Sequence, residues 1–183
     1  MARRLPQETV AFRSRLSTAL LLAESKMGVE SSAMHAATAS LETNSQPRVG
    51  AGVLLVDESG RVLLTLRKFP PEAECWSIVG GKVDFLETVQ GCAIREAREE
   101  VGLRIAIERL LCVTDHLLPD ERQHWVSPAY LGRILEGKAR NCEPQKTREV
   151  RWFGIHELPH NLTMTARNAI EAYERSADFP SRT

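Results

Sequence analysis

Three glutamates lie close together on one predicted helix, and this feature limits most what the chain can fold into. Glu96, Glu99 and Glu100 fall within a turn and a half of the segment 88–101, whose apolar residues recur every four positions. This period predicts a helix with one side packed on a sheet, and Gly102 supplies the C-terminal stop. Like charges at this spacing repel by roughly 0.2–0.5 kcal/mol per exposed pair. The pattern therefore predicts a compensating positive charge.

A divalent metal ion is the compensation that these side chains suit best. On the predicted helix the three carboxylates lie on one patch beside the apolar stripe. Mg²⁺ and Mn²⁺ prefer oxygen ligands from carboxylates, carbonyls and water. Runs of glutamate and arginine are, however, also the commonest decoration of a solvated helix face. The spacing outside the helix separates these two interpretations.

Fixed positions continue on both sides of the predicted helix, from Gly81 to Leu103. With U for an apolar residue, the segment reads G-x5-E-x7-R-E-U-x-E-E-x-G-U, in which the first glutamate is Glu87 and the arginine is Arg95. This pattern resembles the signature of the Nudix hydrolase family. The resemblance covers about residues 49–173, and the first 48 residues have no counterpart in it.

The resemblance implies roles for these positions. Nudix enzymes carry the signature as a loop-helix-loop on a mixed-sheet α/β/α sandwich, and it binds divalent cations that contact a substrate diphosphate. By similarity, the three glutamates of the helix are catalytic metal ligands for Mg²⁺ or Mn²⁺, and Gly80 or Gly81 adds a backbone carbonyl. Glu87 and Arg95 are the pair that ties the loop to the helix.

The order of predicted elements independently indicates an α+β domain with a mixed sheet. Two apolar segments, 49–56 and 61–67, flank the turn sequence Asp57-Glu-Ser-Gly60 and predict a hairpin. Pro128 favours an edge or a bulge in a later strand. The further predicted elements are strands near 76–79, 105–116, 124–135 and 149–153 and a helix over 163–175.

The chain is long enough for one domain with extensions. We expect a helix and a flexible linker over 1–46, a hydrolase domain over 47–176 and a tail over 177–183. The apolar run 16–23 follows arginines, as in an export signal, but acidic and basic residues close it abruptly, so we interpret it as part of an amphipathic helix.

Charge and cysteine content restrict the partners. Lys plus Arg and Asp plus Glu number 24 each, so no overall field attracts the protein to DNA, RNA or an anionic membrane. The four cysteines are scattered without a C-x-x-C pair, which favours reduced thiols and a cytoplasmic protein. We expect a small nucleotide as partner and leave homodimerisation open.

Residues outside the signature are weaker candidates. The base that activates water is either a signature glutamate or one from a downstream loop, where Glu143 and Glu149 are candidates and ordinary loop charges are the alternative. A nucleobase needs a flat apolar partner, for which Trp76 and Trp125 are candidates, as are His116 and His124. Arg67 could reach a phosphate. Core packing or a solvated position is the competing interpretation for each.

Family resemblance leaves several functions open. The stretch 120–125 favours a hydrolase that cleaves a nucleoside triphosphate to a monophosphate and pyrophosphate. Pro119, 16 residues after Leu103, instead favours hydrolysis of ADP-ribose or another nucleoside-diphosphate sugar. A third alternative is a module that senses a nucleotide without turnover. The presence of all three glutamates argues against that alternative.

Overall fold

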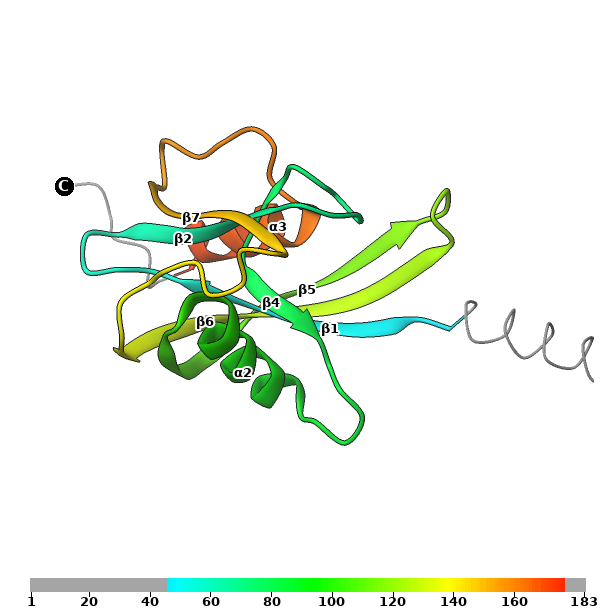
Figure 1. Cartoon of the computed structure of the whole chain (residues 1–183), viewed down its shortest axis with the longest axis horizontal. Helices are drawn as coiled ribbons and strands as arrows, with labels where there is room; N and C mark the ends of the chain where they lie inside the picture. Colours follow the sequence, from blue (N-terminus) through cyan, green and yellow to red (C-terminus); the bar gives the residue numbers. More distant parts are fainter. Residues whose placement is uncertain (1–45, 177–183) are drawn as a thin grey trace, which may run out of the picture. The chain divides into compact units, whose positions relative to one another are not determined.

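The computed structural model describes residues 46–176, and a compact unit begins at Pro47. Figure 1 shows two helices packed around strands of two sheets. In chain order, the elements are β1 (Arg48–Leu55), β2 (Arg61–Arg67), β3 (Trp76–Ser77), β4 (Val79–Lys82), α2 (Val89–Val101), β5 (Arg104–Leu118), β6 (Gln123–Glu136), β7 (Thr147–Gly154) and α3 (Met164–Glu174).

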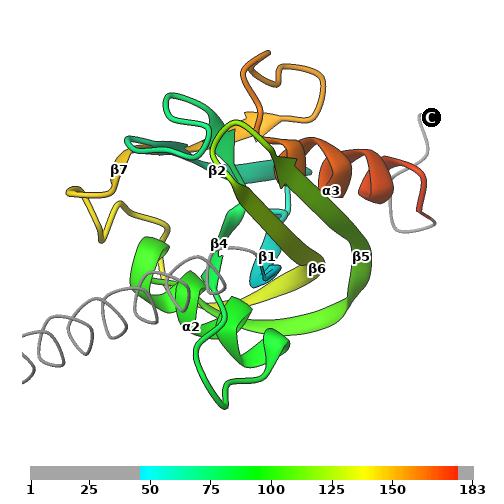
Figure 2. The ribbon, with the colours of Figure 1, turned by 90° about the vertical axis from the view of Figure 1, so that its right-hand side faces the viewer.

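The strands form one mixed and one antiparallel sheet. The four-stranded sheet has the order β4-β1-β6-β5, in which β1 runs parallel to β6 while the other pairs are antiparallel. The three-stranded sheet has the order β3-β2-β7 and is antiparallel throughout. Figure 2 shows α2 and α3 on opposite sides of the four-stranded sheet. The predicted α+β, mixed-sheet sandwich is confirmed.

The predicted hairpin of the first two strands is only partly present. Its turn forms, because the Gly60 N–H donates to the Asp57 carbonyl oxygen at 2.9 Å and Gly60 has a φ of 73°. Beyond the single bridge between Val56 and Val62, however, β1 and β2 join different sheets. Almost all of β1 is buried. A strand buried on both faces suits an inner position, and β1 lies between β4 and β6.

Pro128 does not mark an edge strand, although the ladder beside it is irregular. Its strand, β6, lies between β1 and β5. The β1–β6 pairing passes from Val49↔Val126 directly to Gly52↔Ala129. The register of β5 also shifts next to this position, between Leu110 and Cys112. The missing N–H of proline therefore falls where the ladder with β1 is interrupted.

Each helix packs against one of the two clusters of core residues. Ala93, Ala97 and Val101 of α2 are fully buried against β1 and β4, as the four-residue period predicts. Alanine at position 97 lets the helix lie close to the sheet, since it has the smallest apolar side chain. On the other side of the sheet, α3 buries its alanines and Ile170 against a second cluster that includes Leu54.

The bounds of α2 and of α3 match the sequence prediction to within one residue at each end. The Thr88 hydroxyl caps α2 by accepting from the Gly91 N–H, and Gly102 ends that helix with a φ of 71°. Thr163 caps α3 in the same way. The predicted N-terminal helix, most of the linker and the C-terminal tail lie outside the described residues. Of the helices within 46–176, none has the length and apolar character needed to cross a membrane.

Candidate active site

A glycine pair sits between β1 and α2 and lets a carboxylate approach the strand. The chain passes from the three-stranded to the four-stranded sheet between Ser77 and Val79. A Cβ added to Gly81 would lie 2.2 Å from Oε1 of Glu96, and one added to Gly80 would lie 2.2 Å from the Ala51 carbonyl oxygen. Any side chain here would collide with the helix carboxylate or with β1, so the close approach requires glycine.

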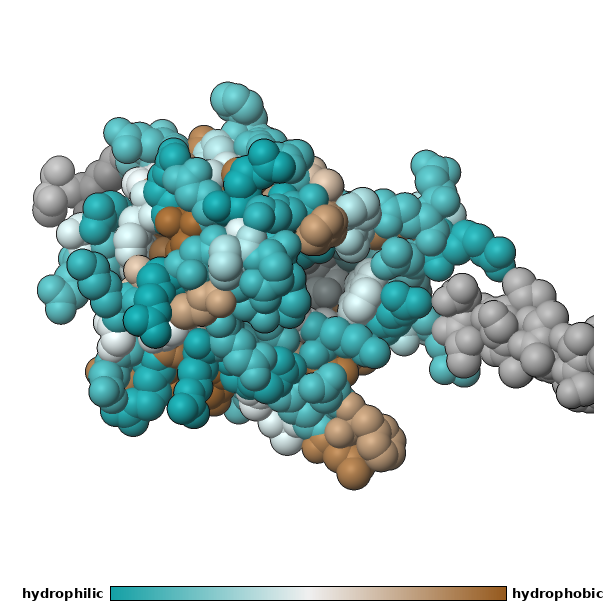
Figure 3. Space-filling view, viewed as in Figure 1, coloured by the Kyte–Doolittle hydropathy of each residue, from teal (hydrophilic) through white to brown (hydrophobic). Residues whose placement is uncertain are grey.

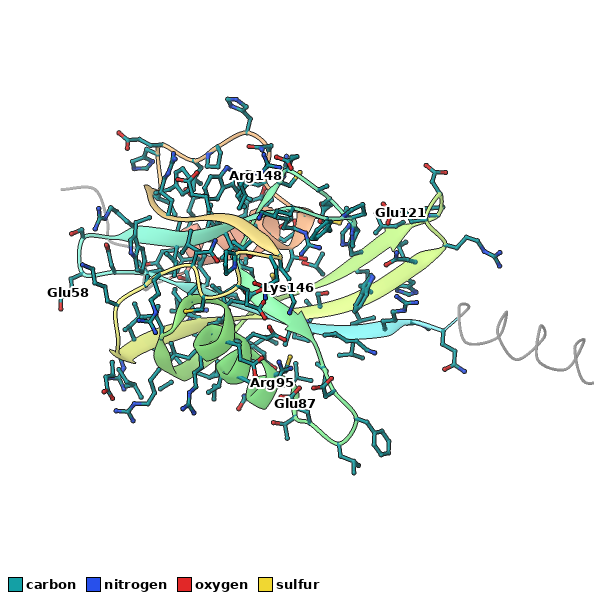
Figure 4. The ribbon with its side chains drawn as sticks, viewed as in Figure 1. Glu58, Glu87, Arg95, Glu121, Lys146 and Arg148 are labelled. Carbon is teal, nitrogen blue, oxygen red and sulfur yellow. The ribbon has the colours of Figure 1, made fainter. Side chains whose placement is uncertain are left out.

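The loop before α2 is tied to the helix by Glu87 and Arg95. The guanidinium donates from Nε to Oε1 at 2.8 Å and from Nη2 to Oε2 at 2.9 Å, a bidentate geometry, and Nη2 also reaches the Lys82 carbonyl oxygen. Figure 4 shows the two side chains together at the base of the loop. These hydrogen bonds from Arg95, with one from the Asp84 N–H, lower the pKa of Glu87 to about 2. The structure thus places these two side chains in contact, and their supporting role stays a prediction.

Arg95 also supplies a positive charge to the glutamates of the helix. Its Nη1 donates to Glu96 Oε1 at 2.7 Å and to Glu99 Oε2 at 2.9 Å. The side chain of Glu96 is only 12% exposed, whereas that of Glu99 is 51% exposed. Within residues 46–176, no three acidic, histidine or cysteine side chains are placed as they stand to hold one ion. The metal-ligand set remains a prediction.

Glu100 faces a different neighbour, the segment that connects β6 to β7. The Gly80 N–H donates to its Oε2 at 3.2 Å. The pKa of Glu100 is raised to about 8, mainly by burial and also by the negative charges of Glu96 and Glu143, although the hydrogen bond from Gly80 lowers it. These charges act on one another because the three carboxylates face the same region. We call Glu96, Glu100 and Glu143 the acidic cluster.

Glu143 brings an unused oxygen to the acidic cluster. Its Oε1 accepts from Lys146 Nζ at 2.9 Å, while its Oε2 is buried and has no hydrogen-bond partner in the described part of the chain. The hydrogen bond to Glu143 is the main cause that raises the pKa of Lys146. Lys146 and two guanidinium groups, those of Arg95 and Arg67, act on the three carboxylates, and Oε2 of Glu143 remains without a partner in the described chain. This donor set fits a hard divalent cation.

A cavity of about 220 Å³ lies beside the glycine pair. It is lined by strands of the four-stranded sheet, by the loop between β2 and β3, and by the start of α3. We call it the base pocket. Its polar and aromatic lining includes Arg67, Glu72, Ser77, His116, Trp125 and Ser127. A second hollow of about 160 Å³ shares Arg67 and Gly80 with it and reaches Glu100 and Lys146. Arg67 therefore lies between the base pocket and the acidic cluster.

Other candidates from the sequence lie elsewhere. Trp76 is 6% exposed, does not line the pocket, and packs edge-on against Phe153 with ring centroids 4.7 Å apart. Its strand pairs with β2 of the smaller sheet, which directs the ring into the core. Glu149 pairs with Arg151 on β7. Pro119 is an exposed residue in the turn between β5 and β6.

Sequence reasoning missed Glu72, Ser127 and Lys146. Glu72 enters the pocket because the N–H of Met164, 92 residues later, donates to its Oε1 at 2.9 Å. No periodicity relates two such positions. Lys146 lies three residues after Glu143, a spacing that suggests an ion pair on a turn of helix, but the surrounding loop sequence does not predict one.

The loop that precedes α2 ends in an exposed apolar tip. Phe85 is 93% exposed and Leu86 is 89% exposed. The tip appears as a brown projection on an otherwise mainly teal face in Figure 3. Neither residue lines the base pocket.

Comparison with known proteins gives consistent matches. The sequence model of the NUDIX domain matches residues 46–174. The chain is 29% identical over 121 residues to an ADP-ribose pyrophosphatase of Methanocaldococcus jannaschii, covering 66% of this chain and 70% of the relative. It is 28% identical over 128 residues to a putative 8-oxo-dGTP diphosphatase of Bacillus subtilis, covering 70% and 80%. A crystal structure of a MutT NUDIX hydrolase from Burkholderia pseudomallei has a TM-score of 0.65 at 46% identity, covering 69% of this chain and 98% of that one.

Proposed function

This chain belongs to the Nudix hydrolase family, and from that premise we propose that it hydrolyses a nucleoside triphosphate to a monophosphate and pyrophosphate. The family membership makes it a hydrolase of nucleotide diphosphate linkages. The observation that carries the proposal is the acidic cluster beside the base pocket, with Arg67 between them. A substrate with a base at one end and phosphates at the other matches this arrangement.

Mg²⁺ or Mn²⁺ would be held by Glu96, Glu99 and Glu100, with a carbonyl from Gly80 or Gly81. The bound ion supplies charge neutralisation at the phosphate oxygens and lowers the pKa of bound water. The chain's own groups hold these carboxylates in place. The Gly80 N–H positions Glu100, and Arg95 positions the other two. Support for the site comes from carboxylate oxygens that face one region beside Gly80 and Gly81.

We assign Glu143 as the residue that takes the proton of the attacking water. In the reaction, a bond forms between the water oxygen and one phosphorus, and the bond from that phosphorus to the bridging oxygen breaks. The leaving group is pyrophosphate or the nucleoside monophosphate, and the water proton passes to a carboxylate. Oε2 of Glu143 is buried and unpartnered in the described chain, while Lys146 fixes Oε1. That arrangement leaves one oxygen able to accept a proton. Glu100 is the alternative acceptor.

Arg67 and Trp125 are the groups that we assign to substrate binding. Arg67 Nε donates to the Pro71 carbonyl oxygen at 2.9 Å, which fixes the guanidinium near both hollows. Its charge can then meet a phosphate. Trp125 lines the base pocket, and an indole ring can offer a flat apolar surface to a base.

Hydrolysis of ADP-ribose or another nucleoside-diphosphate sugar is the second candidate. One of the relatives is named for that reaction, and another for a triphosphate diphosphatase reaction. Pro119, the sequence feature that favours ADP-ribose, does not line the base pocket. We therefore keep the triphosphate as the first candidate.

A substrate panel with Mg²⁺ tests the proposal. It contains the common nucleoside and deoxynucleoside triphosphates, ADP-ribose, NADH and nucleoside-diphosphate sugars, with products identified by mass. We expect monophosphate and pyrophosphate from triphosphates. AMP and ribose 5-phosphate from ADP-ribose, with triphosphates inert, would favour the second candidate. Binding without turnover of any member would indicate a sensing module.

The remaining expectations concern the domain bounds, the cellular location and the partners of the enzyme. We propose residues 47–176 as the catalytic domain, flanked by 1–46 and 177–183. The described cysteines are all free thiols, which supports a cytoplasmic location. A small-molecule nucleotide is the expected partner. The absence of DNA or RNA binding and a homodimeric state stay predictions, for which filter binding and sedimentation are the measurements.

A further inference from the structure

Glu72 holds a carboxylate in a fixed position at the wall of the base pocket. The residue lies in the loop between β2 and β3 and has a φ of 53°, which is unusual for a residue with a side chain. Its Oε1 accepts from the N–H of Met164, the first residue of α3, at 2.9 Å. A strained backbone persists where the surrounding structure holds it. The helix end thus fixes one oxygen and leaves the other facing the pocket.

The second oxygen has no donor in the described chain. Oε2 lies 3.7 Å from Nε2 of His116, which is too long for a hydrogen bond. The His116 side chain is 8% exposed and that of Glu72 is 24% exposed, and both line the base pocket. This oxygen is therefore free to accept a hydrogen bond from a ligand in the pocket.

The pocket volume restricts what that ligand group can be. A cavity of about 220 Å³ is smaller than the roughly 300–1,000 Å³ of a site for a whole drug-sized ligand. It suits one flat ring system, with the rest of the molecule outside. The phosphates would then lie toward Gly80, Gly81 and Arg67, which border the acidic cluster.

Carboxylate chemistry discriminates among the bases. An ionised carboxylate only accepts hydrogen bonds. Guanine offers N1–H and the N2 amine side by side on one edge. Adenine places an acceptor, N1, next to its amine, and uracil flanks its single N–H with two carbonyl oxygens that a carboxylate repels. Guanine is therefore the base that fits the free oxygen of Glu72 best.

We propose that Glu72 selects the base, and that the preferred substrates carry guanine or another purine with the same pair of adjacent donors. This inference deepens the proposed function, on which it rests for the nucleotide nature of the ligand. Glu72 acts here as a specificity-determining residue: it contacts the base and takes no part in the attack on phosphorus.

Binding of nucleoside monophosphates to the full chain tests this proposal without requiring turnover. By calorimetry, we expect GMP to bind most tightly. IMP lacks only the N2 amine and should bind about 10-fold more weakly, with AMP and UMP weaker still, since a site built to pair a polar group rejects analogues that lack it. Equal affinities for GMP, IMP and AMP, or the tightest binding by AMP, would overturn the proposal.

Glu72→Gln is the matched variant. The amide keeps an acceptor oxygen for the Met164 N–H, so α3 stays capped, but it replaces the carboxylate at the pocket. GMP affinity should fall about 10- to 100-fold, and the difference between GMP and IMP should disappear. Glu74→Gln is the control, because Glu74 lies in the same loop with a φ of 59°, pairs with Arg148 and does not line the pocket. It should leave the affinities unchanged.

The outcomes separate this inference from the proposed function. Selective GMP binding that Glu72→Gln removes, without hydrolysis of any nucleotide, would support the inference and remove the enzyme assignment. Hydrolysis of triphosphates with no base preference would support the enzyme assignment and overturn the inference about Glu72. An equal loss of affinity for all four monophosphates in Glu72→Gln would show that the residue is structural and would also overturn the inference. If Glu72→Gln does not fold, the affinities of the unmodified chain for the four monophosphates still test the inference.

Discussion

The acidic cluster and the base pocket lie side by side but are built in opposite ways. Two of the three cluster carboxylates come from α2. The glycines that fit against them lie on β4, and Gly80 precedes Glu100 by 20 residues in the sequence. The pocket shares these glycines and combines them with separate segments, from β1, the loop after β2, β5, β6 and the start of α3. The part of the cluster on α2 and β4 is a property of local sequence, whereas the pocket is a property of the fold. We therefore expect substitutions in the acidic cluster to change mainly kcat and substitutions in the base pocket to change mainly KM.

The largest expected effect is the loss of a cluster carboxylate. Glu100→Gln should lower kcat about 10²-fold or more, because the lost carboxylate would hold the cation that neutralises the phosphate oxygens at the transition state. The amide keeps the shape of the side chain and can still accept from the Gly80 N–H. Thermal melting should thus show an intact fold, and KM should change little. Steady-state kinetics at saturating Mg²⁺ measure both parameters.

A matched control comes from outside the site. Glu58→Gln removes an exposed carboxylate from the turn between β1 and β2, and Glu58 lines neither of the two hollows. It should leave kcat unchanged. A Glu100→Gln protein with full activity and unchanged Mg²⁺ dependence would remove Glu100 from the catalytic site and with it the contrast between the two regions.

Two glycines on paired strands sharpen the comparison. Gly81→Ala would place a Cβ 2.2 Å from the Glu96 carboxylate, so this group must move, and kcat should fall by about 10²-fold. Gly50→Ala would place its Cβ 3.1 Å from the hydroxyl of Ser127, at the pocket. We expect it to raise KM and to change kcat little. If both variants altered kcat and KM alike, the two regions would have to be treated as one functional unit.

The same contrast explains how far the sequence could predict this molecule. The helix and its stop at Gly102 are set by residues a few positions apart, so periodicity predicts them, whereas the Glu87–Arg95 pair is implied by the family resemblance. The hairpin prediction failed for β1 because turn chemistry fixes the turn but not which sheet each strand joins. Trp76 was a reasonable candidate for stacking, yet burial depends on the partner strand. Glu72 has no signal at all, since α3 positions it through a hydrogen bond.

A smaller effect is expected from the contact that links the loop to the cluster. Arg95→Ala removes the bidentate partner of Glu87 and the donor to Glu96. It should lower the melting temperature and also reduce kcat, by about tenfold, because the carboxylates lose a group that positions them. Slower turnover with unchanged melting would indicate instead that Arg95 contacts the substrate directly.

Acid should reveal the stabilising part of that contact. The pKa of Glu87 is lowered to about 2 in the folded protein, against about 4.3 in an unfolded chain. Its stabilising contribution is therefore present above the unfolded value and is lost as the pH falls through the folded value. The melting difference between the unmodified chain and Arg95→Ala should be largest near neutral pH and should disappear near pH 2. A difference that persists in full at pH 2 would mean that another interaction of Arg95 provides the stability.

The smallest expected effect tests whether both regions belong to the described domain alone. All residues of the acidic cluster and of the base pocket lie between Gly50 and Thr165, and two core clusters are built within the same range and α3. A protein that starts at Pro47 keeps all of these groups, so it should retain Mg²⁺-dependent hydrolysis, and its base preference, within about threefold of the full chain. Sedimentation and solubility are where we expect a difference, because residues 16–23 carry an apolar run that suits an interface. Loss of most activity in a soluble protein with an unchanged melting temperature would show instead that the first 46 residues complete the active site. A raised KM with normal kcat would assign that contribution to the base pocket, and a lowered kcat would assign it to the acidic cluster.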